Sequence, residues 1–357
     1  MKIGMIGLPQ AGKKTLYELL TKHKPSEKEI SSHKPVKGLA EIHDPRFDRL
    51  VSIYKPKKEV RARIDIELLP KLAKDTIAKG EIFADINELD AICHVVRVFK
   101  NDSVYHADGS VDPKRDVDFV NAELFLHDLI FIEKRLENLD KKIKQTKEEA
   151  AAKEKDLLLR LKAHLDKTLP LGLLELTDED KKAISSYPLI TRKAMLAVLN
   201  VSEDDLKNTQ LLKQLEYELA SSKTGVMQVS VKIESEIASL ETEKEKEDFL
   251  GALGIEEPAM NMLTRLCIKT LDLVSFFTVG EDEVRQWLVR RGSLAPRAAG
   301  VIHSDMERGF IRAEVIKFAD IDALGSEEKV KEAGKFYVKG KDYVVEDGDI
   351  LNIRFSV

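Results

Sequence analysis

One short stretch near the start of the chain constrains the fold more than any other part of the sequence. It reads Gly7-Leu8-Pro9-Gln10-Ala11-Gly12-Lys13-Lys14-Thr15. The apolar run 1–6 precedes it, and Leu16, Leu19 and Leu20 follow it at helical spacing. A strand, a glycine turn and a helix in this order are the context of the G-x-x-x-x-G-K-[ST] phosphate-binding loop, or P-loop. Its backbone N–H groups and the helix dipole favour an anion, so the stretch predicts a phosphate site anchored by Lys13.

The last position of this motif holds Lys14, where a serine or threonine hydroxyl would normally ligate Mg²⁺. An ammonium group has no lone pair and cannot ligate a metal. Thr15 is adjacent, but one residue turns a helix by roughly 100°. We therefore expect a loop that holds phosphate and holds magnesium poorly. Two alternatives remain. In the first, the Lys14 ammonium takes over part of the metal's electrostatic role; in the second, the turn binds nothing.

Length and composition bound the class of protein. The 357 residues allow two or three domains with a sizeable core. No apolar run is long enough for a bilayer, and the N-terminus lacks the order of a signal peptide, so we expect a cytoplasmic protein with no membrane contact. A net charge of −5 with 34% charged residues excludes a general basic coat. Cys93 and Cys267 lie in apolar sequence and are expected to be buried thiols.

Three of four segments in the first two hundred residues read as strands and suggest a mostly parallel sheet. Residues 22–37 are polar without a clear period and predict a mobile loop, whereas 60–66 alternate as a strand with one exposed face. The runs 91–99 and 194–199 are nearly continuous in apolar residues, as in strands covered on both faces. Ligands of such sheets bind at the carboxyl ends of the strands. His94 lies within one of these runs and is expected to be a satisfied core or edge histidine.

A helical segment lies between the two buried strands. Its apolar positions step by four and three residues over Phe125, Leu129, Ile132, Leu136, Leu139 and Ile143. A charged stretch, 144–156, separates them from a second apolar face at Leu157, Leu158, Leu161 and Leu165. This spacing predicts two helices folded back as an antiparallel coiled-coil hairpin. Its charged tip is either a solvated spacer or a partner-binding arm. Downstream, Thr177 with Asp180 predicts a helix N-cap.

Two short polar motifs follow buried strands downstream of the P-loop. Asn200-Val201-Ser202-Glu203 ends the strand 194–199, and Ser230-Val231-Lys232 ends the strand 225–229. Each motif is weak by itself, but their order predicts loops that read the edge of a nucleotide base.

From Ser275 onward the sequence pattern predicts short strands and turns. Strands are expected at 276–279, 310–315, 335–338 and 350–355. These predict a small α+β domain, a mixed sheet with a short helix packed on it. A basic surface suited to RNA, with solvated charge as the alternative, is formed by Arg285, Arg290, Arg291, Arg297 and Arg308 together with Trp287 and His303.

Nearly the whole chain resembles the YchF-type, or Obg-like, P-loop ATPases. The resemblance is closest at Phe276-Phe277-Thr278-Val279-Gly280, at Ala299-Gly300-Val301-Ile302-His303 and over 307–315, which resemble that family's TGS domain. It implies an α/β fold with a discontinuous P-loop nucleotide-binding domain at 1–120 and 190–274. An antiparallel coiled-coil hairpin at 121–189 interrupts that domain, and a TGS-like β-grasp domain follows at 275–357.

The resemblance also implies a ligand and partners. Members of the family associate with ribosomes and prefer ATP to GTP, because an N-x-x-E form replaces the guanine-reading N-K-x-D. Asn200 and Glu203 match that form, and Ser230-Val231-Lys232 resembles the family's S-A-K motif. The implied ligand is ATP or ADP, with GTP disfavoured, and the implied partner is the ribosome or its RNA, contacted by a monomer through the TGS domain and the coiled coil. The nucleotide-binding residues implied are Gly7, Gln10, Ala11, Gly12, Lys13, Lys14, Thr15, Asn200, Val201, Glu203, Ser230 and Val231.

The departures from the family pattern fall where the chemistry would be. Gln10 replaces an asparagine and Lys14 a serine, and the D-x-x-G region reads Asp65-Ile66-Glu67-Leu68-Leu69-Pro70. Asp65 offers a carboxylate without the glycine, and another alignment puts Leu68 at the Asp position. Ser31 and Ser32 are poor substitutes for the threonine of the first switch. Thr15 and Asp65 are the remaining candidate metal ligands and no residue is assigned to catalysis, so we expect doubtful Mg²⁺ binding and weak or absent hydrolysis. The alternative is a slow ATPase, or GTPase, that acts as a nucleotide-dependent switch on the ribosome.

Overall fold

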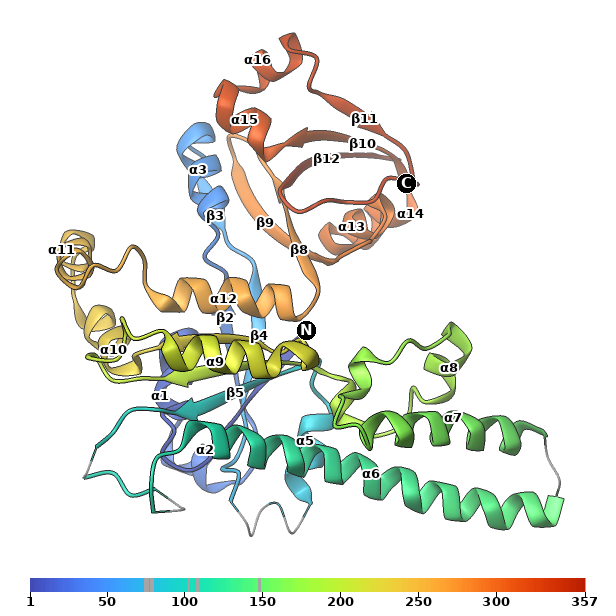
Figure 1. The fold of residues 1–357 in the computed structure, drawn as a ribbon. Coiled ribbons are helices and arrows are strands. Elements are labelled where there is room, and N and C mark those ends of the chain that lie inside the picture. The colour runs from blue at the N-terminus through green and yellow to red at the C-terminus, as the bar shows by residue number, and fades with distance from the viewer. Residues whose placement is uncertain (74–76, 78–79, 102, 107–108, 147–148, 357) are drawn as a thin grey trace. The chain divides into compact units, whose positions relative to one another are not determined.

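The computed structural model describes residues 1–73, 77, 80–101, 103–106, 109–146 and 149–356 (Figure 1). The chain forms two compact units, each built from two separate segments. The first unit comprises Met1–Gly38 and Asp65–Glu256, and the second comprises Leu39–Ile64 and Glu257–Val357. None of the helices in the described residues combines the length and the apolar character of a membrane span.

A six-stranded sheet forms the centre of the first unit. Its strands, in spatial order, are β2 (Val36–Glu41), β4 (Arg63–Leu68), β1 (Lys2–Ile6), β5 (Ala91–Arg97), β6 (Ala194–Asn200) and β7 (Gly225–Val229). β1 pairs in parallel with β4 and β5, and β6 pairs in parallel with β5 and β7. The prediction of a mostly parallel sheet is confirmed. Because the strands are parallel, the loops that follow β1, β6 and β7 leave the same edge of the sheet.

Helices accompany the strands of this unit, and most of them bury apolar side chains. They are α1 (Lys13–Thr21), α2 (Glu27–Ser31), α5 (Glu81–Asn87), α6 (Pro113–Thr146), α9 (Gln210–Leu219), α10 (Val231–Ser239) and α11 (Glu243–Leu253). α5 and α6 pack over Ile6 and Ile92, whereas α6 and α9 pack over Val96 and Leu199. β5 is buried along its whole length, as its continuous apolar run predicts.

α6 extends beyond the sheet and packs against α7 (Glu149–Leu165). All the side chains of the two predicted apolar faces lie in one hydrophobic cluster shared by these helices. Lys155 pairs with Asp140 and Lys162 with Glu133, so α7 runs back along α6. The return path contains η1 (Leu171–Leu173), α8 (Asp178–Ala183) and η2 (Ile190–Arg192). The predicted Thr177 cap of α8 is confirmed as a capping box with Asp180.

The root of this helical arm is fixed to the sheet by one buried carboxylate. Asp128 on α6 has no exposed surface. It accepts hydrogen bonds from the backbone N–H groups of Ile190 and Thr191, both at 2.8 Å, and from the Thr191 hydroxyl at 2.6 Å. η2 lies directly before β6, so Asp128 ties the arm to the strand that ends at Asn200.

Two local predictions in the first two hundred residues are wrong. Within the expected loop 22–37, Ser26 and Glu29 form a capping box that begins α2. The strand expected at 60–66 is split, because β3 (Lys58–Val60) joins the sheet of the second unit while β4 joins that of the first. The alternation at 60–66 therefore combines residues from two sheets.

The second unit contains a mixed sheet, as predicted. Its strands, in spatial order, are β11 (Tyr337–Lys339), β10 (Phe310–Lys317), β12 (Asp349–Phe355), β8 (Leu273–Thr278), β9 (Glu283–Arg290) and β3. β12 pairs in parallel with β8 and β3 with β9, whereas the other neighbours are antiparallel. The sequence suggested one short helix, but the unit contains α3 (Pro45–Tyr54), α12 (Ala259–Thr270), α13 (Ala295–Ile302), α14 (Ser304–Arg308), α15 (Phe318–Leu324) and α16 (Glu327–Glu332).

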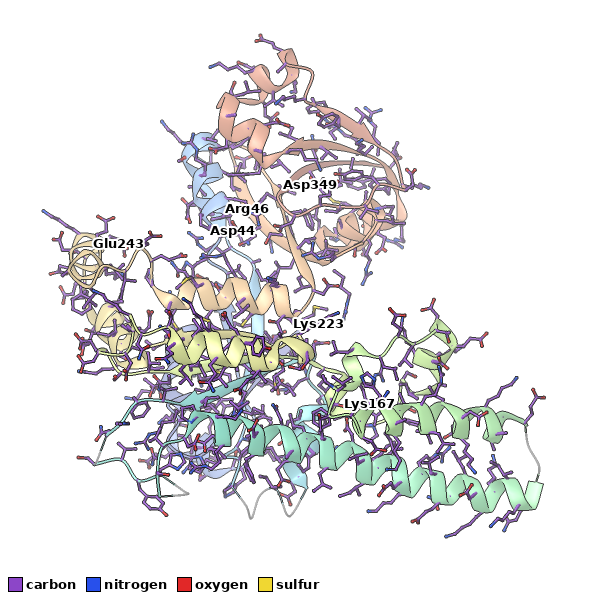
Figure 2. The ribbon with its side chains drawn as sticks, in the orientation of Figure 1. Asp44, Arg46, Lys167, Lys223, Glu243 and Asp349 are labelled. Carbon is purple, nitrogen blue, oxygen red and sulfur yellow. The ribbon has the colours of Figure 1, made fainter. Side chains whose placement is uncertain are left out.

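α3 is part of the core of the second unit although it lies far from it in sequence. Its Phe47 and Leu50 are fully buried in a cluster with Phe277 of β8. Asp44 caps the helix, Pro45 occupies its first turn, and Arg46 Nη2 lies 2.7 Å from Asp44 Oδ2 (Figure 2). The second unit thus combines 39–64 with the segment that begins at Glu257. The sequence-based domain began at 275, and 39–64 was assigned to the nucleotide-binding domain.

Candidate functional site

The turn between β1 and α1 has the backbone of a tight glycine loop. Gly12 caps α1 with φ 89°, and the exposed Gln10 also has a positive φ of 63°. A Cβ atom at Gly7 would lie 2.5 Å from the carbonyl oxygen of Val95, and one at Gly12 would overlap the side-chain amide of Asn200. Both glycines are therefore required by close packing against neighbouring strands.

Lys13 is buried at the start of α1 and points back into the unit. Its ammonium nitrogen donates to the carbonyl oxygens of Leu69 at 2.7 Å and Pro70 at 2.8 Å. Burial, with a smaller effect of the Lys71 charge, lowers the pKa of Lys13 to about 7. The predicted phosphate anchor is thus held by two backbone carbonyls.

Lys14 and Thr15 face away from that buried position. Both are exposed, and Lys14 Nζ lies 3.6 Å from Glu18 Oε1 one turn along α1. In the described residues, no group of three or more histidine, cysteine, aspartate or glutamate side chains is arranged to hold a metal.

Thr15 and Asp65, the two expected metal ligands, lie toward opposite ends of β1. Asp65 is in register with Lys2, and its Oδ2 lies 3.3 Å from the amino terminus of Met1. Thr15 follows the opposite end of β1, and each intervening strand residue adds about 3.3 Å. The alternative position, Leu68, is a buried apolar residue in register with Met5. Neither alignment brings a carboxylate to the loop.

The Asn200 side chain joins the predicted phosphate loop to the predicted base loop at 230–232. Its Nδ2 donates to the Ala11 carbonyl at 3.0 Å, and its Oδ1 accepts from the Val231 N–H at 3.1 Å. Its backbone carbonyl accepts from the N–H groups of Val98 and Phe99 at 2.9 and 3.0 Å. Because Asn200 is 4% exposed, these bonds form without competition from bulk water.

The remaining base-loop residues lie around Asn200. The Val201 N–H donates to the Val229 carbonyl at 2.8 Å, and Ser230 caps α10. Glu203 is exposed and its Oε2 lies 4.0 Å from Lys232 Nζ. The structure therefore brings 7–12, 200–203 and 230–232 together at the carboxyl edge of the sheet. Glu203 is free to rotate toward a ligand, since an exposed pair of this kind contributes little.

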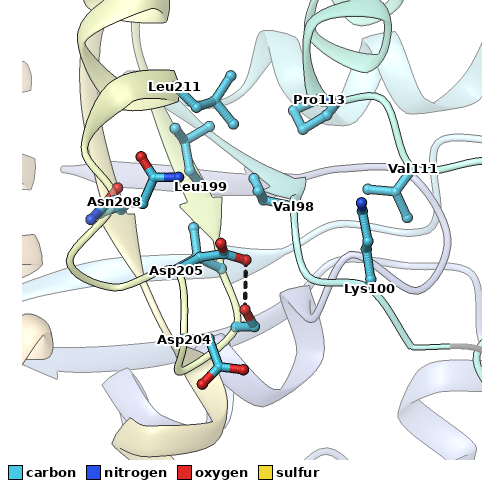
Figure 3. Close-up of a pocket in the computed structure, with 12 residues that line it drawn as sticks. Val98, Lys100, Val111, Pro113, Leu199, Asp204, Asp205, Asn208 and Leu211 are labelled. Carbon is cyan, nitrogen blue, oxygen red and sulfur yellow. Dashed lines mark hydrogen bonds between the residues drawn. The ribbon is translucent and has the colours of Figure 1, made fainter.

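A pocket of about 540 Å³ borders the loop after β6, whereas no residue of 7–12 or 230–232 lines it (Figure 3). Its apolar lining comes from the ends of β5 and β6 and includes Val98, Leu199 and Val201. Asp204 and Asp205 line it from the loop after β6, where Asp205 Oδ2 accepts from the Ser202 hydroxyl at 2.6 Å. The volume falls within the range of small-molecule sites.

The environment of His94 differs from the sequence-based expectation. The ring is buried in the core, but both of its nitrogens lack a hydrogen-bond partner in the described part of the chain. Burial, and next the charge of Lys13, lower the pKa of His94 to about 4. Periodicity identified a buried position here, but only three-dimensional packing could reveal the unsatisfied ring.

Two polar groups near the end of β5 escaped the sequence analysis. The Arg97 guanidinium donates to the carbonyls of Phe99, Asn101, Val104 and Tyr105 and so folds the loop after β5. Buried His106 Nε2 lies 3.0 Å from Asp116 Oδ2 on α6. In the sequence, the His106–Asp116 pair is marked by no more than a histidine shortly before a helix that begins with proline.

Most arginines of the predicted basic surface have acidic partners. Arg291 pairs with Asp272, Arg297 with Glu307 and Arg308 with Asp305. Arg285 lies over the Trp287 ring at 4.1 Å and 3.8 Å from Glu283. His303 caps α14. This pairing reduces the free positive charge that the surface offers to a polyanion.

Comparison with known proteins identifies the family. The chain is 40% identical to "Ribosome-binding ATPase YchF" of Bacillus subtilis (strain 168), over 99% of each chain. The chain belongs to the YchF family. Residues 273–356 of this YchF-family chain match the model YchF-GTPase_C, described as "Protein of unknown function (DUF933)". It is also 35% identical to "Obg-like ATPase 1" of Oryza sativa subsp. japonica, over 100% of this chain and 92% of that protein.

A solved structure supports the same relationship. The YchF GTPase of Schizosaccharomyces pombe superimposes on this YchF-family chain with a TM-score of 0.83, at 29% identity, covering 99% of this chain and 97% of that one. Two of these relatives are named ATPases and the third a GTPase, so their names agree on a nucleotide and differ on its base.

Proposed function

We propose that this chain binds an adenine nucleotide, ATP or ADP in preference to GTP, at the loops 7–15, 200–203 and 230–232. The bridge made by Asn200 supports this proposal, because its side chain bonds to the backbone of both Ala11 and Val231. In this arrangement Lys13, the backbone N–H groups of 10–15 and the dipole of α1 hold the phosphates. Asn200, Val201, Glu203, Ser230 and Val231 surround the base.

Hydrolysis by this chain is proposed to be weak or absent. Phosphoryl transfer depends on positioning and on a metal that bridges the outer phosphates. Lys14 cannot ligate such a metal, Thr15 is exposed, and Asp65 pairs with the amino terminus. Losing these contacts costs orders of magnitude in rate, while binding through backbone N–H groups persists. Tight Mg²⁺ binding is therefore not part of the proposed function.

The proposed partner is the ribosome or its RNA, contacted by a monomer. The B. subtilis relative is named ribosome-binding, which supports this partner. We propose the helical segment 121–189 as a coiled-coil arm and the segment 275–357 as a TGS-like domain, and both as contact surfaces. The paired arginines of the second unit make the charged tip of the arm the stronger candidate. Ribosome co-sedimentation that weakens as salt rises supports this partner, and a lack of co-sedimentation at low salt contradicts it.

Calorimetric titration of ATP, ADP and GTP, each with and without Mg²⁺, tests the nucleotide proposal. We expect ADP and ATP to bind more tightly than GTP, with little change when Mg²⁺ is added. Lys13→Ala should remove binding, whereas Lys14→Ser, which restores the motif hydroxyl, should increase the Mg²⁺ dependence. Failure of all three nucleotides to bind contradicts the proposal.

A slow ATPase, or GTPase, that switches on the ribosome is the second candidate. The names of relatives with 35–40% identity over the whole chain favour it. Phosphate release that requires Mg²⁺ and disappears in Lys13→Ala would replace the first proposal with this one. GTP turnover exceeding ATP turnover would further reverse the proposed base preference.

A further inference from the structure

The contact between Lys13 and residues 69–70 has a role that nucleotide binding alone does not explain. Both carbonyl oxygens lie within 2.8 Å of the ammonium nitrogen that the proposed function assigns to phosphate. An ammonium has three hydrogens, and two of them are used here. One N–H therefore remains, and a phosphate that accepts a second hydrogen bond from Lys13 must displace the Leu69 or the Pro70 carbonyl.

The carbonyls are held in position from both sides. The Leu69 N–H donates to the Met5 carbonyl at 3.1 Å, and the Leu72 N–H donates to the Gly7 carbonyl at 3.3 Å. Pro70 has no N–H of its own. The segment 69–72 is thus fastened to β1 and to the start of the phosphate loop, and it directs two acceptors at Lys13.

His94 supplies a second, independent observation at this place. Its ring is 1% exposed, its nitrogens lack partners in the described residues, and Lys13 lies near enough to affect its pKa. β5 carries it next to β1, in register with Ile6. A buried neutral imidazole without a partner is costly, and it keeps one N–H available for donation.

We propose that the Leu69 and Pro70 carbonyls form a latch on Lys13, which a di- or triphosphate opens, and that His94 then donates to a carbonyl that Lys13 has left. Charge-assisted bonds to phosphate are stronger than bonds to a neutral carbonyl, so the ligand can win this exchange. The latched state leaves His94 unsatisfied, and the open state satisfies it. The opening of the latch by a nucleotide rests on the proposed function. The latch itself is a property of the ligand-free protein.

Hydrogen exchange of the ligand-free protein tests the latch separately. Lys13→Met removes the donor, so the Leu69 and Leu72 amides should exchange about tenfold faster than in the unmodified protein. Lys14→Met, a matched change one residue along α1, should leave them unchanged. Unaltered exchange of the β6 amides in both variants shows that the sheet is intact. Equal exchange at Leu69 and Leu72 in the two variants overturns the latch.

Ligand titration tests the exchange of donors. ADP and pyrophosphate should accelerate exchange at Leu72, whereas adenosine, which lacks phosphate, should not. His94→Phe should weaken ADP binding about tenfold and leave adenosine binding unchanged, because only phosphate opens the latch. An equal effect on both ligands overturns the role of His94. If ADP does not bind while Lys13→Met still accelerates exchange, the latch stands and the proposed nucleotide function fails.

Discussion

Asn200 Nδ2 lies 3.0 Å from the carbonyl oxygen of Ala11, although 189 positions separate the two residues in sequence. The same side chain accepts from Val231, so one buried amide holds three loops together. Replacement of this amide should affect the whole edge of the sheet.

Asn200→Ala should destabilise the first unit by about 2–4 kcal/mol, because it leaves a buried carbonyl and a buried N–H without partners. Urea unfolding monitored by circular dichroism measures the change. Gln210→Ala, at an exposed position on α9, should cost less than about 0.5 kcal/mol. A similar small cost for both variants would show that the bridge contributes nothing.

Gly12→Ala should be more damaging than an alanine at another glycine with positive φ. At Gly12 a Cβ atom meets the Asn200 amide, and at φ 89° the left-handed backbone adds about 1–2 kcal/mol. Gly254 has φ 69°, and a Cβ atom there would lie 3.9 Å from the flexible Lys207 ammonium group, an ordinary contact distance, so Gly254→Ala reports mainly the backbone cost. We expect Gly12→Ala to exceed this control by at least about 1 kcal/mol in unfolding free energy. Equal costs would mean that the Asn200 side chain moves aside freely.

His94 should make the first unit sensitive to acid. Burial lowers its pKa to about 4 in the folded chain, against 6.5 as the ordinary value. Between these values the unfolded chain binds more protons, so stability is lost as pH falls from 6.5 to 4, by up to about 3 kcal/mol. Urea midpoints of His94→Leu should fall less over this range than those of the unmodified protein. His33→Asn, at an exposed position, serves as the control and should follow the unmodified curve.

Asp128→Asn should weaken the root of the helical arm. An amide at this position replaces one of the two carboxylate oxygens with an NH2 group, which faces the N–H of either Ile190 or Thr191, and the loss should be about 2–4 kcal/mol. Hydrogen exchange at the Ile190 and Thr191 amides should rise with it. Asp178→Asn on α8, whose side chain is fully exposed, should change neither quantity. Unchanged amide exchange in Asp128→Asn would show that Asp128 does not hold the arm to the segment before β6.

Periodicity predicted the elements whose environment is uniform along their length. β5 is buried, β6 is buried over most of its length and β7 is partly buried, and their apolar runs give their positions to within a residue or two. The apolar stripes of α6 and α7 predicted their mutual packing for the same reason. The segment 60–66 was wrongly predicted as one strand, because its residues alternate but belong to two sheets.

The neighbours of the glycine loop could be predicted where residue identity marks them. Gly7, Gly12 and Lys13 form a loop, and Asn200, Ser230 and Val231 lie beside it, as their order in the sequence suggested. The acceptors of Lys13 are backbone carbonyls, which leave no trace in residue identity. Asp65 was the plausible carboxylate by residue type, but the register of β4 with β1 places it at the other end of the strand.

Residues 39–64 belong to the second unit but are synthesised before most of the first, and this order matters during translation. Phe47 and Leu50 emerge early from the ribosome, yet the β-strand that covers them, carrying Phe277, is made only after the entire first unit. Until then α3 exposes an apolar face with no native neighbour. A nascent chain of this protein must therefore shield that face or delay its collapse, and the C-terminal segment 273–356 produced alone would lack part of its own interior.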